Sequence, residues 1–204
     1  MGWSLVLKAF PELLSAALLL SIWVEPQRFG IDWFRSGVLT LLLEFFVIHA
    51  GGFMAVLMYD PDTPRGKRGL QVGGLAVGYL LFISAFAWGF DAWWMLWTFV
   101  WLCFSKLQAI WTGSVPEEKD RTLAIVSWAL SVAVYLGAVS LTVFVFVPPL
   151  GITAAVRDAA HFDPNGGVWE AEPHRALAGA VLYFTVMGLS RPLLAWAFGK
   201  RARE

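Results

Sequence analysis

Apolar stretches long enough to cross a bilayer recur along the whole chain, and short charged loops separate them. About 20 apolar residues are needed to span roughly 30 Å of hydrocarbon. In lipid only helices and closed barrels satisfy every backbone polar group, and barrel strands would be shorter and strictly alternating. The sequence therefore predicts an all-α, polytopic integral membrane protein with a six-transmembrane-helix bundle as its single domain, 1–204. The predicted spans are approximately residues 3–24, 36–58, 70–90, 92–111, 122–147 and 176–198.

The amino-acid composition supports the membrane class and limits the kinds of binding partner that the chain is expected to have. Hydrophobic residues make up 58% of the chain and charged residues 15%, whereas soluble domains are nearer a quarter charged. The formal net charge is zero, so no nucleic-acid partner is implied. Cys103 is the one cysteine, which excludes an intrachain disulfide and a CxxC metal or redox motif. The lipid bilayer is the partner that the composition predicts.

The distribution of lysine and arginine predicts the orientation, because cytoplasmic loops carry the excess of these residues. With six spans both termini lie on one side, and that side holds nine basic residues against four on the other. We therefore expect an inner (plasma) membrane protein with both termini cytoplasmic and the long loop 148–175 outside. The nine are Lys8, Arg65, Lys67, Arg68, Lys119, Arg121, Lys200, Arg201 and Arg203, and the four are Arg28, Arg35, Arg157 and Arg175.

Two ionisable residues lie deep in the second predicted span. Counted from the start of the span, Glu44 is roughly 12 Å deep and His49 roughly 20 Å deep. Polar groups at such depths are costly and mark functional sites. Gly51 and Gly52 follow, and they let a neighbouring helix, a cofactor or a substrate approach the backbone. Two interpretations stay open: structural hydrogen bonding between helices, or a shared site for a proton, metal, haem or substrate.

The loop 148–175 holds the other two histidines. Carboxylates and imidazoles alternate in it, a donor set that suits a divalent transition metal, although a solvated acidic loop fits the same pattern. Asp158 and His161 are spaced to share a helix face, and a short helix is expected at about 154–161, before a turn at 163–167. His174 opens the last span, where it would face Glu44. The candidate metal ligands are His49, His174, Glu44 and His161.

Aromatic and small residues form two further patterns. Trp93, Trp97 and Trp101 recur at i+4 in the fourth span and share a face. They fit an aromatic belt with lipid-facing packing, or a wall for a planar ligand such as haem, with Trp101 too deep for the belt. Gly74 and Gly78 form a GxxxG pattern, which favours close helix packing within the bundle or between protomers.

A third polar set is expected near the cytoplasmic face. Glu12, Lys106 and Arg191 lie at the corresponding ends of three predicted spans. They would form an ion-pair lock that fixes helix register, or a cytoplasmic gate.

These features predict a small transporter or channel for an ion or small solute. Its pathway would include Glu44, His49, Gly51, Gly52 and Trp101. One alternative is a membrane-embedded protein that binds a divalent transition metal or haem through His49 and His174, as a redox or metal-dependent enzyme. Another is an accessory subunit of a larger membrane complex. A homo-oligomer is compatible with each of these functions.

Overall fold

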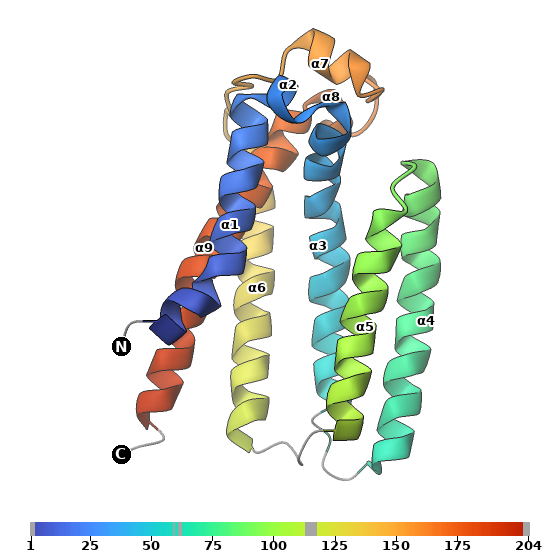
Figure 1. Ribbon diagram of the computed structural model, residues 1–204, viewed down its shortest axis with the longest axis vertical. Coiled ribbons are helices and arrows are strands. Elements are labelled where there is room, and N and C mark those ends of the chain that lie inside the picture. The colour runs from blue at the N-terminus through green and yellow to red at the C-terminus, as the bar shows by residue number, and fades with distance from the viewer. Residues whose placement is uncertain (1–2, 59, 61–62, 113–117, 202–204) are drawn as a thin grey trace. The chain divides into compact units, whose positions relative to one another are not determined.

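The computed structural model describes residues 3–58, 60, 63–112 and 118–201, with side chains described for all of these except 3–8, 112, 118–120, 191 and 195–201. Within this part the chain is helical, without strands, which confirms the predicted all-α class (Figure 1). The helices are α1 (Trp3–Val24), α2 (Pro26–Phe29), α3 (Ile31–Met58), α4 (Arg65–Gly89), α5 (Trp94–Thr112), α6 (Glu118–Phe144), α7 (Ala154–Ala159), α8 (Val168–Ala171) and α9 (Pro173–Arg201).

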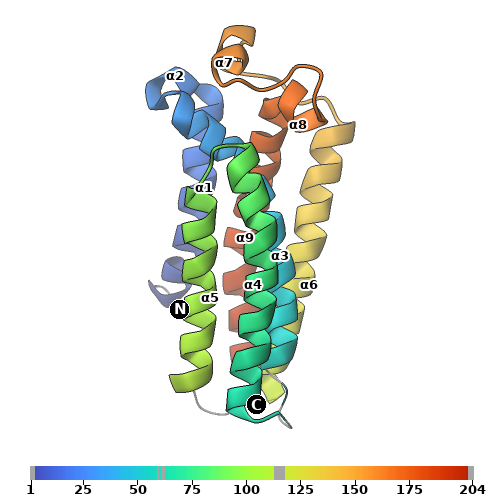
Figure 2. The ribbon, with the colours of Figure 1, turned by 90° about the vertical axis from the view of Figure 1, so that its right-hand side faces the viewer.

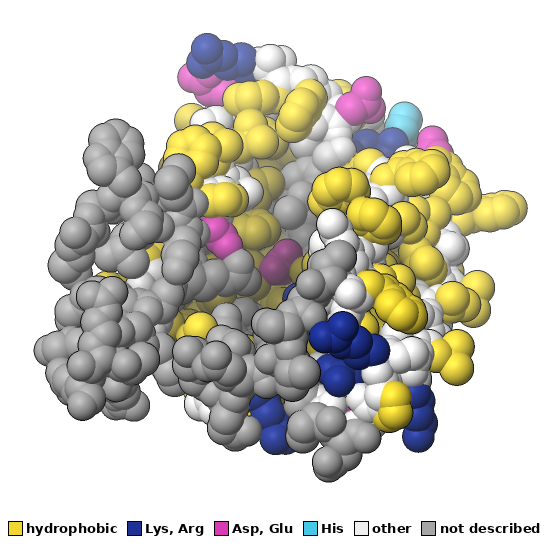
Figure 3. Space-filling view, turned by 60° about the horizontal axis from the view of Figure 1, so that its bottom comes forward, with side chains coloured by type: hydrophobic (Ala, Val, Ile, Leu, Met, Phe, Trp, Pro, Cys, Tyr) yellow, Lys and Arg dark blue, Asp and Glu magenta, His cyan; other side chains and the backbone are white. Residues whose placement is uncertain are grey.

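Four of the described helices are long and apolar enough to cross a membrane: α3, α4, α6 and α9. This number agrees with a multi-pass membrane protein but not with the six membrane spans that the sequence predicts. In α1 the described apolar part is the shorter stretch Ala9–Val24. α5 is not among the four candidate spans. Figure 3 shows hydrophobic side chains over much of the visible described surface, with Lys and Arg side chains on the end turned forward.

The contacts divide the chain into two units, one made of Met1–Leu42 with Leu130–Glu204 and the other of Leu43–Ala129. We call them unit 1 and unit 2. Unit 1 is discontinuous in sequence, because its first and last helices, α1 and α9, pack against each other. Leu13 of α1 contacts α9 at Gly188, so the pair is antiparallel and the beginning of α1 lies toward the end of α9 (Figure 1).

Glycines permit the close helix contacts of unit 1. A Cβ at Gly37 of α3 would lie 2.9 Å from Leu177 of α9, and one at Gly179 would lie 3.0 Å from Leu41 of α3. Tyr135 of α6 donates a hydrogen bond from its hydroxyl to the Leu41 carbonyl oxygen at 3.2 Å. Backbone approach and interhelical hydrogen bonds such as this one therefore join α3, α6 and α9.

The hairpin of α4 and α5 belongs to unit 2 (Figure 2). A tight turn at residues 90–93 joins the helices, as the sequence predicted, and Asp91 adopts a positive φ of 49° there. The rings of Tyr79 and Phe99 lie 6.0 Å apart, and Gly69 lies against Trp111. These two contacts establish the antiparallel register of the hairpin.

The GxxxG pattern of α4 makes no close contact with the described residues. A Cβ added at Gly74 or Gly78 would meet no heavy atom within 4 Å in this part of the chain. Close packing of the pattern, within the bundle or between protomers, stays a prediction.

The loop between α3 and α4 is fastened by a buried arginine. The Arg68 side chain donates to the carbonyl oxygens of Met58 at 3.0 Å and Thr63 at 2.9 Å, and only 8% of the residue is exposed. Met58 is the last residue of α3, so its carbonyl oxygen has no amide donor within the helix, and the Arg68 guanidinium supplies one. This basic residue, which the sequence assigns to a cytoplasmic loop, caps the preceding helix.

The long loop of unit 1 is folded. As predicted, a short helix occurs here, α7, and Thr153 caps it by accepting a hydrogen bond from the Val156 amide. The following turn is held by the Asp163 carboxylate, which accepts from the Asn165 amide at 2.8 Å. Phe162 is buried and meets Phe34 of α3 edge to face at 5.8 Å. We call residues 148–172 the cap.

Candidate functional site

His49 lies within the span formed by α3, half-buried, and leans along its own helix. Its Nδ1 is 3.0 Å from the Phe45 carbonyl oxygen, and the two rings are 4.2 Å apart. A carbonyl oxygen only accepts, so Nδ1 carries the proton in this hydrogen bond. In a neutral imidazole Nε2 then keeps its lone pair and can accept a proton or bind a cation.

Beside His49, Trp128 of α6 fills the space that Gly52 leaves. Its indole Nε1 donates to the Ile48 carbonyl oxygen at 3.1 Å, and a Cβ at Gly52 would overlap the indole ring. Gly51 differs, because nothing among the described residues lies within 4 Å of a Cβ placed there. The sequence predicts that a neighbouring helix, a cofactor or a substrate approaches these two glycines. At Gly52 it is a neighbouring helix, α6, that does so. All these residues belong to unit 2.

Glu44 is half-buried on the same helix and in the same unit as His49. Five residues turn a helix by about 140° beyond a full turn, so the two side chains leave α3 in different directions. His174 is half-buried in the first turn of α9, in unit 1. That Glu44 and His49 form one site, with His174 facing it, stays a prediction.

The aromatic ladder of α5 is on the surface of the protein. Trp97 is 74% exposed and Trp101 72%, and Trp93 is exposed as well. Side chains so open do not form the wall of a closed pocket. The arrangement favours contact with lipid or with another protein. That Trp101 lines a pathway stays a prediction.

The predicted metal ligands do not gather. Among the described residues, no group of three or more His, Cys, Asp or Glu is placed to hold a metal ion. Asp158 and His161 do not share a helix face, because α7 ends at Ala159 and His161 follows it with a positive φ of 56°. His161 is exposed. The metal or haem interpretation therefore has no geometric support in this part of the chain.

The predicted set near the cytoplasmic face is only partly described. Glu12 lies against α9, where its Cβ would be 3.3 Å from a Cβ at Gly188, about one turn from residue 191. The Arg191 side chain is outside the described residues, and Lys106 belongs to unit 2 while Glu12 belongs to unit 1. The ion-pair lock, or gate, stays a prediction.

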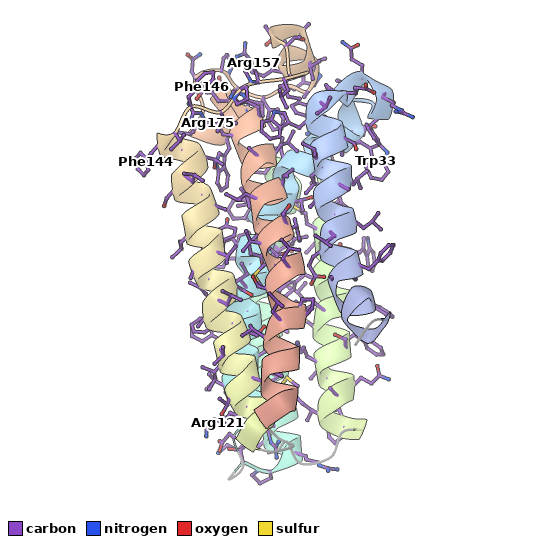
Figure 4. The ribbon with its side chains drawn as sticks, turned by 90° about the vertical axis from the view of Figure 1, so that its left-hand side faces the viewer. Trp33, Arg121, Phe144, Phe146, Arg157 and Arg175 are labelled. Carbon is purple, nitrogen blue, oxygen red and sulfur yellow. The ribbon has the colours of Figure 1, made fainter. Side chains whose placement is uncertain are left out.

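Arg175 forms a cluster that sequence reasoning missed. Its Nη1 donates to the carbonyl oxygens of Thr142, Val143 and Val145 at 2.8, 3.0 and 3.1 Å, and its Nε pairs with the Glu172 carboxylate. The side chain is only 16% exposed. A cation thus holds the carboxyl end of α6, where the helix dipole is negative (Figure 4). The sequence feature that could have predicted this cluster is the spacing of Glu172 and Arg175, which lie three residues apart at the start of a span.

Comparison of the chain with models of known protein families, with curated proteins and with solved structures gave no significant match.

Proposed function

We propose that the chain is a six-span membrane protein that moves a proton, a small ion or a small solute, with His49 as its responsive group. The observation that carries this proposal is the hydrogen bond from Nδ1 to the Phe45 carbonyl. It directs the lone pair of Nε2 away from the backbone of α3. An intramembrane imidazole with one nitrogen fixed and the other basic is suited to pass a proton or bind a cation.

Glu44 supplies the second ionisable group in this proposal. A carboxyl in a low-dielectric setting takes its neutral form unless a cation or donors compensate. In this proposal Glu44 would bind the transported proton or cation together with His49. The backbone at Gly51 is open, on a face of α3 turned away from His49, whereas Trp128 closes the backbone at Gly52.

Six crossings are supported by the two antiparallel pairs. At 1.5 Å per residue, α1 and α5 are about 33 and 28 Å long, close to the hydrocarbon thickness. Each packs along a helix that is itself apolar enough to span, α9 for α1 and α4 for α5. Because a tight turn joins α4 to α5, α5 returns along α4 toward the end at which α4 begins.

A second candidate, an accessory subunit of a larger membrane complex, is favoured by one observation. The surface of the α4–α5 hairpin combines exposed tryptophans with the open glycines Gly74 and Gly78. Small residues let a foreign helix approach, and tryptophans supply contact area.

Replacing His49 with Ala should abolish transport without unfolding the protein. In vesicles containing the purified protein and an internal pH-sensitive dye, we expect wild type to collapse an imposed proton gradient and the variant to match protein-free vesicles. Glu44→Gln should lower the rate as well. His161→Ala is the matched control, because this imidazole is exposed in the cap, and it should keep the wild-type rate. Wild-type vesicles as tight as empty ones would reject proton movement.

Topology is tested with reporter fusions at Gly66 and Asn165. The excess of basic residues places Gly66 in the cytoplasm, and an odd number of crossings between the two positions places Asn165 outside. A reporter active only in the cytoplasm should work at Gly66 and fail at Asn165. The same signal at both positions contradicts the six-span arrangement.

A further inference from the structure

We propose that residues 144–150, where the chain leaves α6, form an anchor that inserts into the lipid interface of the outer leaflet. We call these residues the exit segment. Its side chains, its backbone hydrogen bonds and its place in the fold support this inference independently of the transport proposal.

Large apolar side chains of the exit segment point away from the protein. Phe144 is 85% exposed and Phe146 80%, and Figure 4 shows both rings projecting outward. Val147, between Phe146 and the prolines, is buried and fixes the segment to unit 1. Aromatic rings at such exposure are costly in water, and they are typical of the level where hydrocarbon meets headgroups.

The backbone of the exit segment is not helical after Phe144, and protein donors reach three of its carbonyls, those of Val145, Pro148 and Pro149, as well as carbonyls in the last turn of α6. Leu141 accepts from the Val145 amide, and the Arg175 guanidinium takes the carbonyls of Thr142, Val143 and Val145. The Trp23 indole donates to Pro148 at 3.2 Å, and the Ile152 amide donates to Pro149 at 2.9 Å.

These hydrogen bonds suit a segment that lies at the lipid interface. A helix end in water needs no such partners, because water hydrates its last carbonyls. In lipid, irregular backbone is tolerated only where protein groups satisfy it. Pro148 and Pro149 reduce the demand further, since proline has no amide hydrogen to satisfy.

The fold places the exit segment at the end of the candidate spans, where the lipid interface is expected. It directly continues α6, a candidate span, and Arg175 lies in the first turn of α9, another candidate span. Trp33, in the first turn of a third span, α3, is 54% exposed and supplies another aromatic ring at the same end of unit 1 (Figure 4). The exit segment overlaps the first residues of the cap, 148–150, so the anchor lies at the base of the cap.

Site-directed spin labelling tests the proposal. A Cys103→Ala background removes the native cysteine, and single cysteines at Phe144, Phe146 and Asn165 receive a nitroxide. The protein is reconstituted into phosphatidylcholine and phosphatidylglycerol vesicles. Collisions of the nitroxide with oxygen, which concentrates in hydrocarbon, and with a water-soluble nickel chelate are compared.

At 144 and 146 we expect the ratio of oxygen to nickel collisions to be several-fold higher than at 165, the aqueous control in the cap turn. A ratio at 146 equal to that at 165 would place the segment in water and overturn the proposal. Low accessibility of position 146 to both reagents would also overturn it, since it would mean that a protein surface covers the segment. Helix content by circular dichroism confirms that each labelled variant is folded.

Discussion

Replacing Arg175 with Met is expected to lower the free energy of unfolding by about 3–5 kcal/mol, because the change leaves the Glu172 carboxylate and three backbone carbonyls without their shared cation. Arg175→Lys should recover only part of this loss, since a lysine ammonium has no planar fork to reach several carbonyls. The measurement is the midpoint of thermal unfolding in detergent, followed by circular dichroism.

Arg28→Met is the matched control for Arg175. Arg28 also belongs to unit 1 and also pairs with a glutamate three residues away, Glu25 at 3.7 Å, but its side chain is 77% exposed. An exposed pair contributes little, so the midpoint should stay at the wild-type value. Equal midpoints for Arg175→Met and Arg28→Met would mean that the carbonyl cluster does not stabilise the fold.

Replacing Gly52 with Ala should destabilise the protein by about 1–3 kcal/mol, because the new methyl group overlaps the Trp128 indole and displaces its hydrogen bond to Ile48. Gly51→Ala should instead raise the stability by up to about 1 kcal/mol, since the site is open and alanine favours helix. Adjacent residues thus give opposite signs. Both midpoints are compared with wild type in the same detergent.

A double variant separates the overlap with Trp128 from a general effect at Gly52. If the indole is the cause, adding Trp128→Leu to Gly52→Ala should cost less than the sum of the two single changes. Strict additivity would show that the methyl group harms the helix in some other way.

Local patterns predicted the helices well. The long apolar runs give helices in the described parts of the six predicted spans, although α6 ends at Phe144 and not at 147, and the turn at Asp91 and the helix α7 were both anticipated. These features depend on residues near one another in the chain, so hydropathy and turn residues are sufficient to find them. The membrane class followed from the same information.

Contacts between distant segments were harder to predict. The GxxxG pattern at Gly74 and Gly78 drew attention, whereas close packing occurs at the isolated glycines Gly37 and Gly179. A glycine permits close approach, but only the partner surface decides whether a helix comes near. The sequence likewise showed that Arg175 is charged but not that three carbonyls end beside it, since they come from residues 142–145.

The candidate site was found through the rarity of ionisable residues in spans, which required only the sequence. The tautomer of His49 needed the structure, because it depends on the side-chain rotamer that brings Nδ1 to Phe45. The contact of Trp128 with Gly52 was not predicted, because the residues next to Trp128 in the sequence do not indicate which residue its side chain meets.

The pairing of α1 with α9 has a consequence for biogenesis. The ribosome delivers α1 well before α9, so α1 is made without the helix that packs against it in the finished protein. Residues 43–129, which make up unit 2, are contiguous and can assemble while synthesis continues. A chain truncated before α9 would therefore leave an orphaned first helix, which is the kind of surface that membrane quality-control proteases and chaperones recognise.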